Sequence, residues 1–277
     1  MNPVKKASSA ADRIIIIGAG RMCGAIVSGL IRSGTSPRSI VASDVSAERL
    51  KQIAQEYKIQ TVSDNQKAAD QGDIIILAVK PQALADAIDK LTIKGHKLIV
   101  SIAAGITLEY LEGKFPDNPV VRAMPNNPAL IGEGITALAY GAKVGKKEIQ
   151  KANQIFKSVG DTVEVPENMM DAVTGLSGSG PAFLYLFVEG MVEAGESLGI
   201  TRKMAEKLAL QTVLGSAKTL KKSGKAAHEL REMVTSPGGT TIEGLRILEN
   251  RGFKAAISEA VAAAARRAKE ISKEWTR

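Results

Sequence analysis

The sequence predicts an α/β fold in which a doubly wound sheet domain is followed by an all-α domain. Three observations support this prediction. Short apolar runs alternate with helical stretches through the first part of the chain, as in βαβ units. A glycine-rich turn follows the first of these runs, and helical periodicity fills the rest of the chain. The 277 residues are enough for two domains, each with its own core.

The strands of the predicted sheet are short apolar runs bounded by turn residues. Six of them are expected in the body of the sheet, at residues 13–17, 39–43, 60–62, 74–79, 97–102 and 120–124. Two further segments, 136–140 and 162–165, are expected to extend the sheet at its far edge. Helices are expected in most of the gaps, which gives a doubly wound domain over residues 12–166. Residues 1–11 are expected to form a flexible tail.

A change to helical periodicity begins near Asp171, and a helical domain is predicted over residues 167–277. Several apolar faces on one small domain favour pairing with a second copy, so we expect a homodimer at least. Further helices are predicted over 201–222, 226–234, 241–250 and 253–273. The first long helix is marked by apolar residues at the i, i+3, i+4, i+7 spacing of one face, namely Leu184, Phe187, Val188, Met191, Val192 and Leu198.

Composition and charge exclude several classes of protein. No apolar run approaches the roughly 18 residues of a membrane helix, and the N-terminal stretch lacks a signal-peptide core, so we expect a cytoplasmic protein. The net charge of +8 is spread over mixed helix faces and aromatics are only 4%, which argues against a nucleic-acid partner. Because Cys23 is the only cysteine, we expect no internal disulfide and no metal site.

The glycine-rich turn predicts a dinucleotide site. The strand RIIII runs into GAGRMCG and then into a helix expected over residues 25–32. Gly18 permits a tight turn, and Gly20 lets the backbone approach a pyrophosphate, which the N–H groups and dipole of the helix N-terminus would hold. Cys23 replaces the third glycine of the usual spacing, so the packing of strand on helix must accommodate a small thiol.

Residues at the ends of two predicted strands leave the choice of cofactor open. Asp44 can accept the ribose hydroxyl groups of NAD. Ser43, Ser46 and Arg49, which lie around it in sequence, suit the additional phosphate of NADP instead. Lys80 follows the fourth strand at the edge where ligands of such sheets bind, so we expect it to face the cofactor rather than solvent.

Seven segments of the chain resemble pyrroline-5-carboxylate reductase in the order and spacing of that family: IGAGRM, SDN, LAVKPQ, SIAAGIT, RAMPNNPALIGEG, AVTGLSGSGPAF and VTSPGGTT. The resemblance runs from about Arg13 to the last helix. It implies NAD(P)H-dependent reduction of the cyclic imine 1-pyrroline-5-carboxylate to L-proline, the last step of proline biosynthesis. It also implies a Rossmann-like domain followed by a helical domain that interlocks with a partner subunit, in dimers or in rings of dimers such as decamers.

The resemblance places the cofactor, NADPH by preference and NADH as the alternative, along the glycine turn and the strand ends. Ala104 and Asn126 are implied to line the nicotinamide side. Cys23 and Asn127 depart from the family pattern, the latter where threonine is usual. The residues expected to bind the cofactor are Gly18, Ala19, Gly20, Arg21, Met22, Ser43, Asp44, Asn65, Ala78, Val79, Lys80, Pro81, Ala104 and Asn126.

Two segments suit a small carboxylate substrate. In SPGGTTIEGL a turn leads into a helix, so that the N–H groups around residues 239–241 form a nest for an anion. SGSGPAF repeats this arrangement with Pro181 at a helix start, so the two helix N-termini could converge on one anion. The alternative is that both segments are only well-capped helices, an interpretation favoured for a single Gly-Pro start but not for the doubled glycines and paired threonines of SPGGTT. The resemblance assigns the catalytic position to Thr241, as the hydrogen-bond partner of the imine nitrogen. The residues expected to bind the substrate are Ser177, Ser179, Gly239, Thr240 and Thr241.

Little acid catalysis is expected, because a protonated imine already accepts a hydride readily. Neither His96 nor His228 lies within the motifs, and no Ser-His-Asp combination does. We therefore expect the protein to act mainly by orienting the nicotinamide against the imine carbon.

Two other functions are weighed against this one. A β-hydroxyacid dehydrogenase or imine reductase of the 6-phosphogluconate-dehydrogenase-like group has the same architecture but needs a lysine near the start of the helical domain, and TGLSGSGPAF contains none. A nucleotide sensor or scaffold without turnover would carry a degraded substrate loop, whereas SPGGTT is intact. The sequence leaves open the preference between NADPH and NADH, the dimer against a larger ring, and activity on six-membered imines.

Overall fold

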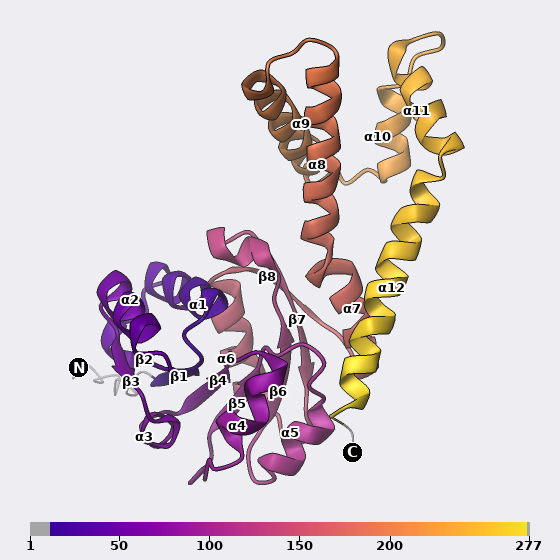
Figure 1. Cartoon of the computed structure of the whole chain (residues 1–277). Coiled ribbons are helices and arrows are strands. Elements are labelled where there is room, and N and C mark those ends of the chain that lie inside the picture. Colours follow the sequence, from indigo (N-terminus) through magenta and orange to yellow (C-terminus); the bar gives the residue numbers. More distant parts are fainter. Residues whose placement is uncertain (1–11, 276–277) are drawn as a thin grey trace, which may run out of the picture. The chain divides into compact units, whose positions relative to one another are not determined.

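The computed structural model describes residues 12–275, so the tail expected at residues 1–11 lies outside the described residues. The described chain divides into two compact units (Figure 1). Ser179–Ala263 forms one of them, the helical unit, and the described residues on either side of that segment form the other, the sheet unit. This division differs from the expected boundary after residue 166, because residues 167–178 and the C-terminal end of the chain pack with the sheet. Within the described residues, no helix is long and apolar enough to cross a membrane.

The sheet unit is built on eight strands, and the two additional strands extend its far edge as predicted. The strands lie in the order β3-β2-β1-β4-β5-β6-β7-β8. The first six are parallel, β7 is antiparallel to β6, and β8 is parallel to β7. They are β1 (Ile14–Ile17), β2 (Ile40–Ser43), β3 (Gln60–Val62), β4 (Ile74–Leu77), β5 (Leu98–Ser101), β6 (Val120–Met124), β7 (Gly134–Tyr140) and β8 (Gly160–Glu164).

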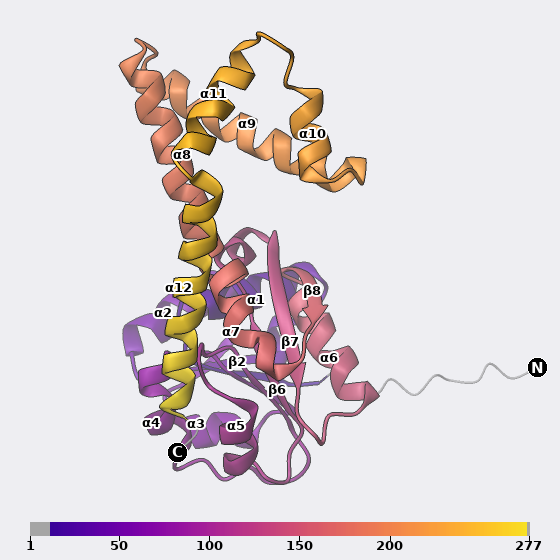
Figure 2. The ribbon, with the colours of Figure 1, turned by 90° about the vertical axis from the view of Figure 1, so that its right-hand side faces the viewer.

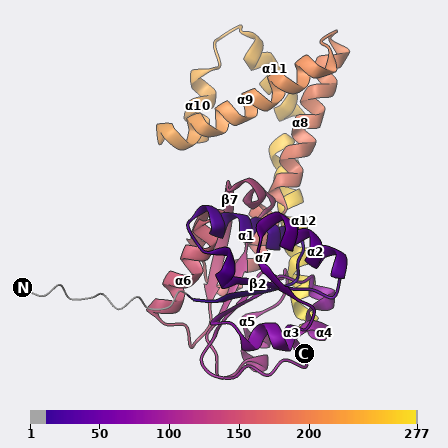
Figure 3. The same cartoon turned by 90° about the vertical axis from the view of Figure 1, so that its left-hand side faces the viewer.

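Helices cover both faces of the sheet, as a doubly wound fold requires (Figure 3). Alternate isoleucines of β1 point to opposite faces: Ile14 and Ile16 pack into one apolar core, and Ile15 and Ile17 into the other. The central strands β1 and β4 are therefore apolar along their whole length, because they are buried on both sides. One face carries α1 (Arg21–Arg32), α2 (Ala47–Tyr57) and α6 (Lys146–Lys157), and the other carries α3 (Asn65–Asp70), α4 (Leu84–Ile88) and α5 (Leu108–Lys114).

The end of the sheet unit is helical but irregular. α7 (Met170–Val173) continues directly into a π-helical turn, Thr174–Gly178. Short 3-10 turns complete the unit at η1 (Pro37–Ser39), η2 (Pro81–Ala83), η3 (Asn127–Ile131) and η4 (Glu167–Met169).

The helical unit has little core of its own. α8 and α9 meet near the turn that joins them, through Val192, Ala205 and Ala209, and then diverge (Figure 2). Phe187 meets Phe253 with ring centroids 6.1 Å apart. The last helix begins in this unit and ends in the sheet unit. The helices are α8 (Gly180–Ser197), α9 (Arg202–Ser223), α10 (Ala227–Met233), α11 (Thr240–Asn250) and α12 (Phe253–Lys273).

Some boundaries differ from the sequence prediction. α1 begins at Arg21 rather than at residue 25, because the backbone is already helical directly after the glycine turn, where apolar periodicity gives no signal. Cys23 therefore lies in the first turn of the helix. Leu198 lies beyond the end of α8 and is exposed, so it does not belong to the apolar face of that helix. β4 ends at Leu77, which leaves Ala78 and Val79 in the loop at the sheet edge.

Candidate active site

One edge of the sheet collects the residues expected to bind a dinucleotide. They follow the carboxyl ends of the first six strands, β1 to β6, and these strands are parallel, so the residues meet at the same edge. The order of strands reverses between β1 and β4, which is where such sheets open a crevice. The sequence thus placed its candidate residues on neighbouring strand ends, although they span more than a hundred positions.

Gly18 makes the turn out of β1. Its φ of +105° is a left-handed conformation, and an added Cβ would lie 2.6 Å from the carbonyl oxygen of Ala78. The Gly18 N–H donates to the carbonyl of Ser43 at 2.6 Å, and the Ala78 N–H donates to the carbonyl of Ile17 at 2.7 Å. Only glycine fits, because the turn is squeezed between the ends of β2 and β4.

Gly20 stands at the N-terminus of α1 and faces open space. No side chain caps this helix start, and an added Cβ at Gly20 would meet no atom within 4 Å. The first N–H groups of α1 have no partner within the helix and carry the positive end of its dipole. This bare helix start fits a pyrophosphate, which needs N–H donors and close approach to the backbone.

Cys23 packs inside the protein and does not face the edge. It is fully buried in the core between α1 and the sheet. Burial raises the pKa of the Cys23 thiol to about 12, and the carboxylate of Asp44 adds to the shift. The third position of the glycine motif is therefore occupied by a small, protonated side chain that serves packing.

Asp44 is held by the backbone at the end of β2. Its Oδ2 accepts the N–H of Ala19 at 2.7 Å, and its Oδ1 accepts the N–H of Ser46 at 2.8 Å. The side chain is only 9% exposed, whereas that of Arg49, whose Nη1 lies 4.0 Å from Oδ2, is 60% exposed. The carboxylate thus ties the glycine turn to the start of α2, and the neighbouring guanidinium extends into solvent.

Polar groups farther along the edge are also held in place. Ser43 donates its hydroxyl hydrogen to Asn65 Oδ1 at 2.6 Å, and Asn65 Nδ2 donates to the carbonyl of Ala87 at 3.2 Å. Lys80 is exposed directly before η2, and Ala104 is half-buried in the loop after β5. The edge is therefore a preformed surface with a cationic side chain at its middle.

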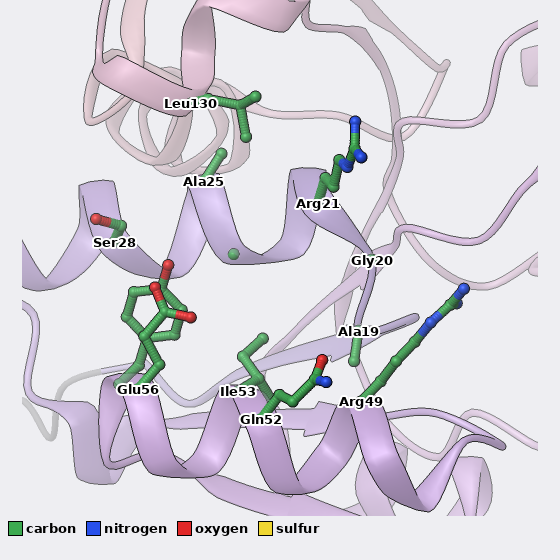
Figure 4. A pocket seen from close by; sticks show the side chains of 12 residues that line it. Ala19, Gly20, Arg21, Ala25, Ser28, Arg49, Gln52, Ile53, Glu56 and Leu130 are labelled. Carbon is green, nitrogen blue, oxygen red and sulfur yellow. The ribbon is translucent and has the colours of Figure 1, made fainter.

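A pocket of about 420 Å³ opens beside the glycine turn, between α1 and α2 (Figure 4). Arg21 and Arg49 lie at its end near Gly20, whereas Glu56 lies at the opposite end. The end with Arg21 and Arg49 adjoins the glycine turn, so the pocket carries positive charge beside Gly20.

Arg122 is a buried cation in β6 that sequence reasoning missed. Its Nη1 lies 2.7 Å from Glu167 Oε1, and its Nη2 lies 3.8 Å from Asp171 Oδ1. Ser272 of α12 donates to the same Asp171 oxygen at 2.9 Å. An arginine within the apolar run VVRAM is the signal that could have indicated a buried ion pair. This network fixes α7 and the end of α12 on the sheet.

Asn126 follows β6 and reaches the π-helical turn. Its Nδ2 donates to the carbonyl of Ser177 at 3.1 Å, and its Oδ1 accepts the N–H of Ile135 at 3.0 Å. The Ser177 hydroxyl donates to the carbonyl of Val173 at 3.1 Å. The carboxyl end of β6 and the segment that holds Ser177 are thus joined by one side chain.

The substrate motif SPGGTT lies in the helical unit at the start of α11. Gly238 has φ +70°, Gly239 is the N-cap residue of α11, and no side chain caps that helix. Thr240 and Thr241 occupy the first turn and are exposed, while Ser179 precedes α8 in the same unit. The Gly239 N–H donates to the carbonyl of Ser236 at 3.1 Å, so the uncapped N–H groups of this helix start are those that follow Gly239. No group of histidine, cysteine and acidic side chains suited to a metal occurs among residues 12–275.

Comparison with known proteins gives two family matches. Residues 167–271 match the family described as pyrroline-5-carboxylate reductase dimerisation, and residues 13–105 match the family described as NADP oxidoreductase coenzyme F420-dependent. A pyrroline-5-carboxylate reductase from Synechocystis sp. is 44% identical over 93% of this chain and 97% of its own length. One from Methanosarcina acetivorans is 43% identical over 95% of this chain and 98% of its own length.

Solved structures agree with the sequence relatives. A 1-pyrroline-5-carboxylate reductase from Streptococcus pyogenes superposes with a TM-score of 0.86 at 38% identity, covering 93% of this chain and 98% of its own. The Plasmodium falciparum pyrroline carboxylate reductase with NADP bound has a TM-score of 0.84 at 31% identity, covering 95% of this chain and 98% of its own. A prephenate dehydrogenase from A. aeolicus at 15% identity and a TM-score of 0.53 shares the fold alone.

Proposed function

This chain belongs to the pyrroline-5-carboxylate reductase family, and from that premise we propose how its own residues carry the reaction. The protein is an oxidoreductase of proline biosynthesis that acts on the imine of pyrroline-5-carboxylate, with NADP(H) as its cofactor. Its substrate is a small molecule, and its dimerisation region indicates a homo-oligomer. The observation that carries the residue assignments is the bare N-terminus of α1 behind Gly18 and Gly20.

The cofactor edge is proposed to hold the dinucleotide from one end to the other. The segment from Gly18 to Met22 receives the pyrophosphate on backbone N–H groups. Asn65 and the loop from Ala78 to Pro81, with Lys80 exposed in it, line the middle of the edge. Ala104 and Asn126 border the nicotinamide, which when bound supplies the hydride.

NADPH is proposed as the preferred cofactor because of what Asp44 and Arg49 do. Both oxygens of Asp44 already accept backbone N–H groups, so this carboxylate supports the turn instead of binding ribose hydroxyl groups. Arg49 is exposed beside it and is assigned to the additional phosphate of NADPH, with Ser43 and Ser46 nearby. The two backbone N–H dipoles also offset part of the repulsion between the Asp44 carboxylate and that phosphate.

The start of α11 is proposed to hold the imino acid. The N–H groups of Thr240 and Thr241, directly after Gly239, receive its carboxylate, and the Thr241 hydroxyl oxygen accepts a hydrogen bond from the protonated imine nitrogen. Ser177 and Ser179 are assigned to the same substrate. A hydroxyl is a weak acid and the protonated imine needs little further activation, so Thr241 places the substrate rather than protonating it.

The finer features of the assembly are proposals as well. We expect a dimer whose dimerisation domain begins near residue 167, with rings of dimers such as decamers as the larger form. We expect the protein to work in the cytoplasm, without a nucleic-acid or membrane partner. Its exposed apolar helix faces support the pairing of copies. The mixed charges along its sequence support the expectation of a cytoplasmic protein without a nucleic-acid or membrane partner.

The first test is oxidation of NADPH by the purified protein with pyrroline-5-carboxylate, with the product identified as proline. Thr241→Ala is expected to lower kcat/KM about 10- to 100-fold, since one hydrogen bond to a charged group is lost. Thr219→Ala, in the exposed part of α9, is the matched control and should match the unchanged protein. Unaltered turnover in Thr241→Ala would remove that residue from the site, and absence of proline in the unchanged protein would overturn the proposed reaction.

A further inference from the structure

The π-helical turn before α8 leaves one carbonyl without a helical donor. In a regular helix the carbonyl of Ser177 would accept the N–H of residue 181, but that residue is Pro181, which has no N–H. The donor one position later is also committed, because the Ala182 N–H donates to the carbonyl of Ser179 at 3.0 Å. The carbonyl of Ser177 therefore needs a partner from another part of the chain.

Asn126 supplies that partner from the cofactor edge. Its Nδ2 donates to the carbonyl of Ser177 at 3.1 Å, and its Oδ1 accepts the N–H of Ile135 at 3.0 Å. The residue is only 9% exposed, so neither hydrogen bond is easily replaced by water. Both ends of the side-chain amide are thus engaged within the protein, which leaves little capacity for a hydrogen bond to the cofactor.

The turn is also seated tightly against β6. An added Cβ at Gly178 would lie 2.7 Å from the Met124 methyl carbon Cε. The hydroxyl groups of Thr174 and Ser177 donate back to carbonyls one turn earlier, at 2.8 and 3.1 Å. π-helical turns often occur at functional sites, since they redirect a helix at a local cost. Here the redirected segment holds Ser177 beside the strand end that holds Asn126.

We infer that Asn126 is a positioning residue for substrate, which acts by holding the carbonyl of Ser177 and so sets the π-helical turn against the cofactor edge. This inference rests on the proposed function, in which Ser177 binds the substrate, so that the position of Ser177 relative to β6 affects turnover. Loss of the amide donor should impair turnover while leaving the cofactor bound, since the glycine turn and Arg49 are at the other end of the edge.

Two substitutions separate the donor from the acceptor. Asn126→Ala removes both hydrogen bonds, whereas Asn126→Asp keeps the size and the acceptor for Ile135 but loses the donor while its carboxyl is ionised. Both are expected to lower kcat about tenfold at neutral pH, with the Kd of NADPH, measured by fluorescence titration, within about twofold of the unchanged protein. Acidification protonates the carboxyl of Asn126→Asp, whose O–H then donates to Ser177.

The pH profile therefore decides the inference. The kcat of Asn126→Asp relative to that of the unchanged protein should rise as the pH falls, while the same ratio for Asn126→Ala should stay flat. A flat ratio for both variants would overturn the inference, as would a rise in the Kd of NADPH that matches the fall in kcat. If Asn126→Ala does not fold, the isosteric Asn126→Asp carries the test alone. Proline formation by the unchanged protein, measured alongside, keeps this result separate from the proposed function.

Discussion

Replacing Arg49 by glutamine should weaken NADPH binding and spare NADH. A charge-assisted hydrogen bond to a phosphate contributes about 1.5–3 kcal/mol when shielded, and an exposed pair contributes less. Because the Arg49 side chain is 60% exposed, we expect slightly less than that range, about 1.4 kcal/mol, or about a tenfold rise in the Kd of NADPH. The Kd of NADH should change by less than about twofold, because NADH has no group for the guanidinium to bind. Fluorescence titration with each cofactor measures both values.

Asp44→Asn tests the other half of the same reasoning. An amide places an NH₂ group against one of the two backbone N–H groups that Asp44 accepts, so the glycine turn should loosen and both cofactors should bind more weakly by similar factors. If Asp44 were a ribose ligand, NADH would lose much more affinity than NADPH. Lys51→Gln removes a positive charge from the exposed face of the same helix and is the matched control for Arg49→Gln. Equal losses for NADPH in those two variants would refute the assignment of Arg49.

Two further predictions concern the glycine turn. Gly18→Ala should abolish cofactor binding and lower the melting temperature, since a Cβ would lie 2.6 Å from the Ala78 carbonyl oxygen. Gly34→Ala is the control, because Gly34 has φ +95° but open space around it. Left-handed strain should lower the free energy of unfolding of that variant by only about 1–2 kcal/mol. The Cys23 thiol should resist labelling by a thiol reagent at pH 8, because its pKa of about 12 leaves roughly one thiolate in 10⁴, and it should label readily in denaturant. Folding raises the pKa of the Cys23 thiol from 9.0, so the protonated thiol favours the folded state. Its contribution to the free energy of unfolding is complete below about pH 9 and is lost as the pH rises toward 12. Denaturant titration across that pH range measures this loss. Rapid labelling of the native protein would contradict the burial of Cys23.

The sequence predicted the parts of the site that are set by the backbone. Gly18 is required by a left-handed turn wedged against a neighbouring strand, and such a requirement leaves a glycine that can be read directly. The central strands β1 and β4 were predicted because both of their faces are buried, which makes them continuously apolar. The βαβ pattern indicated parallel strands, whose carboxyl ends bring the candidate residues to one edge.

The direction of polar side chains was beyond sequence reasoning. Asp44 can accept ribose hydroxyl groups or backbone N–H groups, and the choice depends on where Ala19 and Ser46 place their amides in space. The ion-pair partners of Arg122 were equally beyond sequence reasoning, because Glu167 and Asp171 come from another part of the chain and no periodicity connects them to β6. Periodicity reports which face of an element is buried, and it carries no information on which hydrogen bonds form across elements.

In the helical unit, a correct prediction of the helices does not predict a core. Apolar periodicity placed α8 to α12 correctly, yet only Val192, Ala205 and Ala209 form the buried cluster of that unit within one chain. Large apolar side chains on the same helices remain exposed, among them Leu184, Tyr185, Leu186, Met204, Leu208, Leu210, Leu214, Ile247 and Ile257. Each would contribute about 1.5–3 kcal/mol if it became buried, so a second copy is the natural partner for these faces. Because α8 and α11 also begin with the segments assigned to the substrate, the pairing that buries their apolar faces would fix those helix starts as well, which links oligomerisation to the geometry that turnover needs.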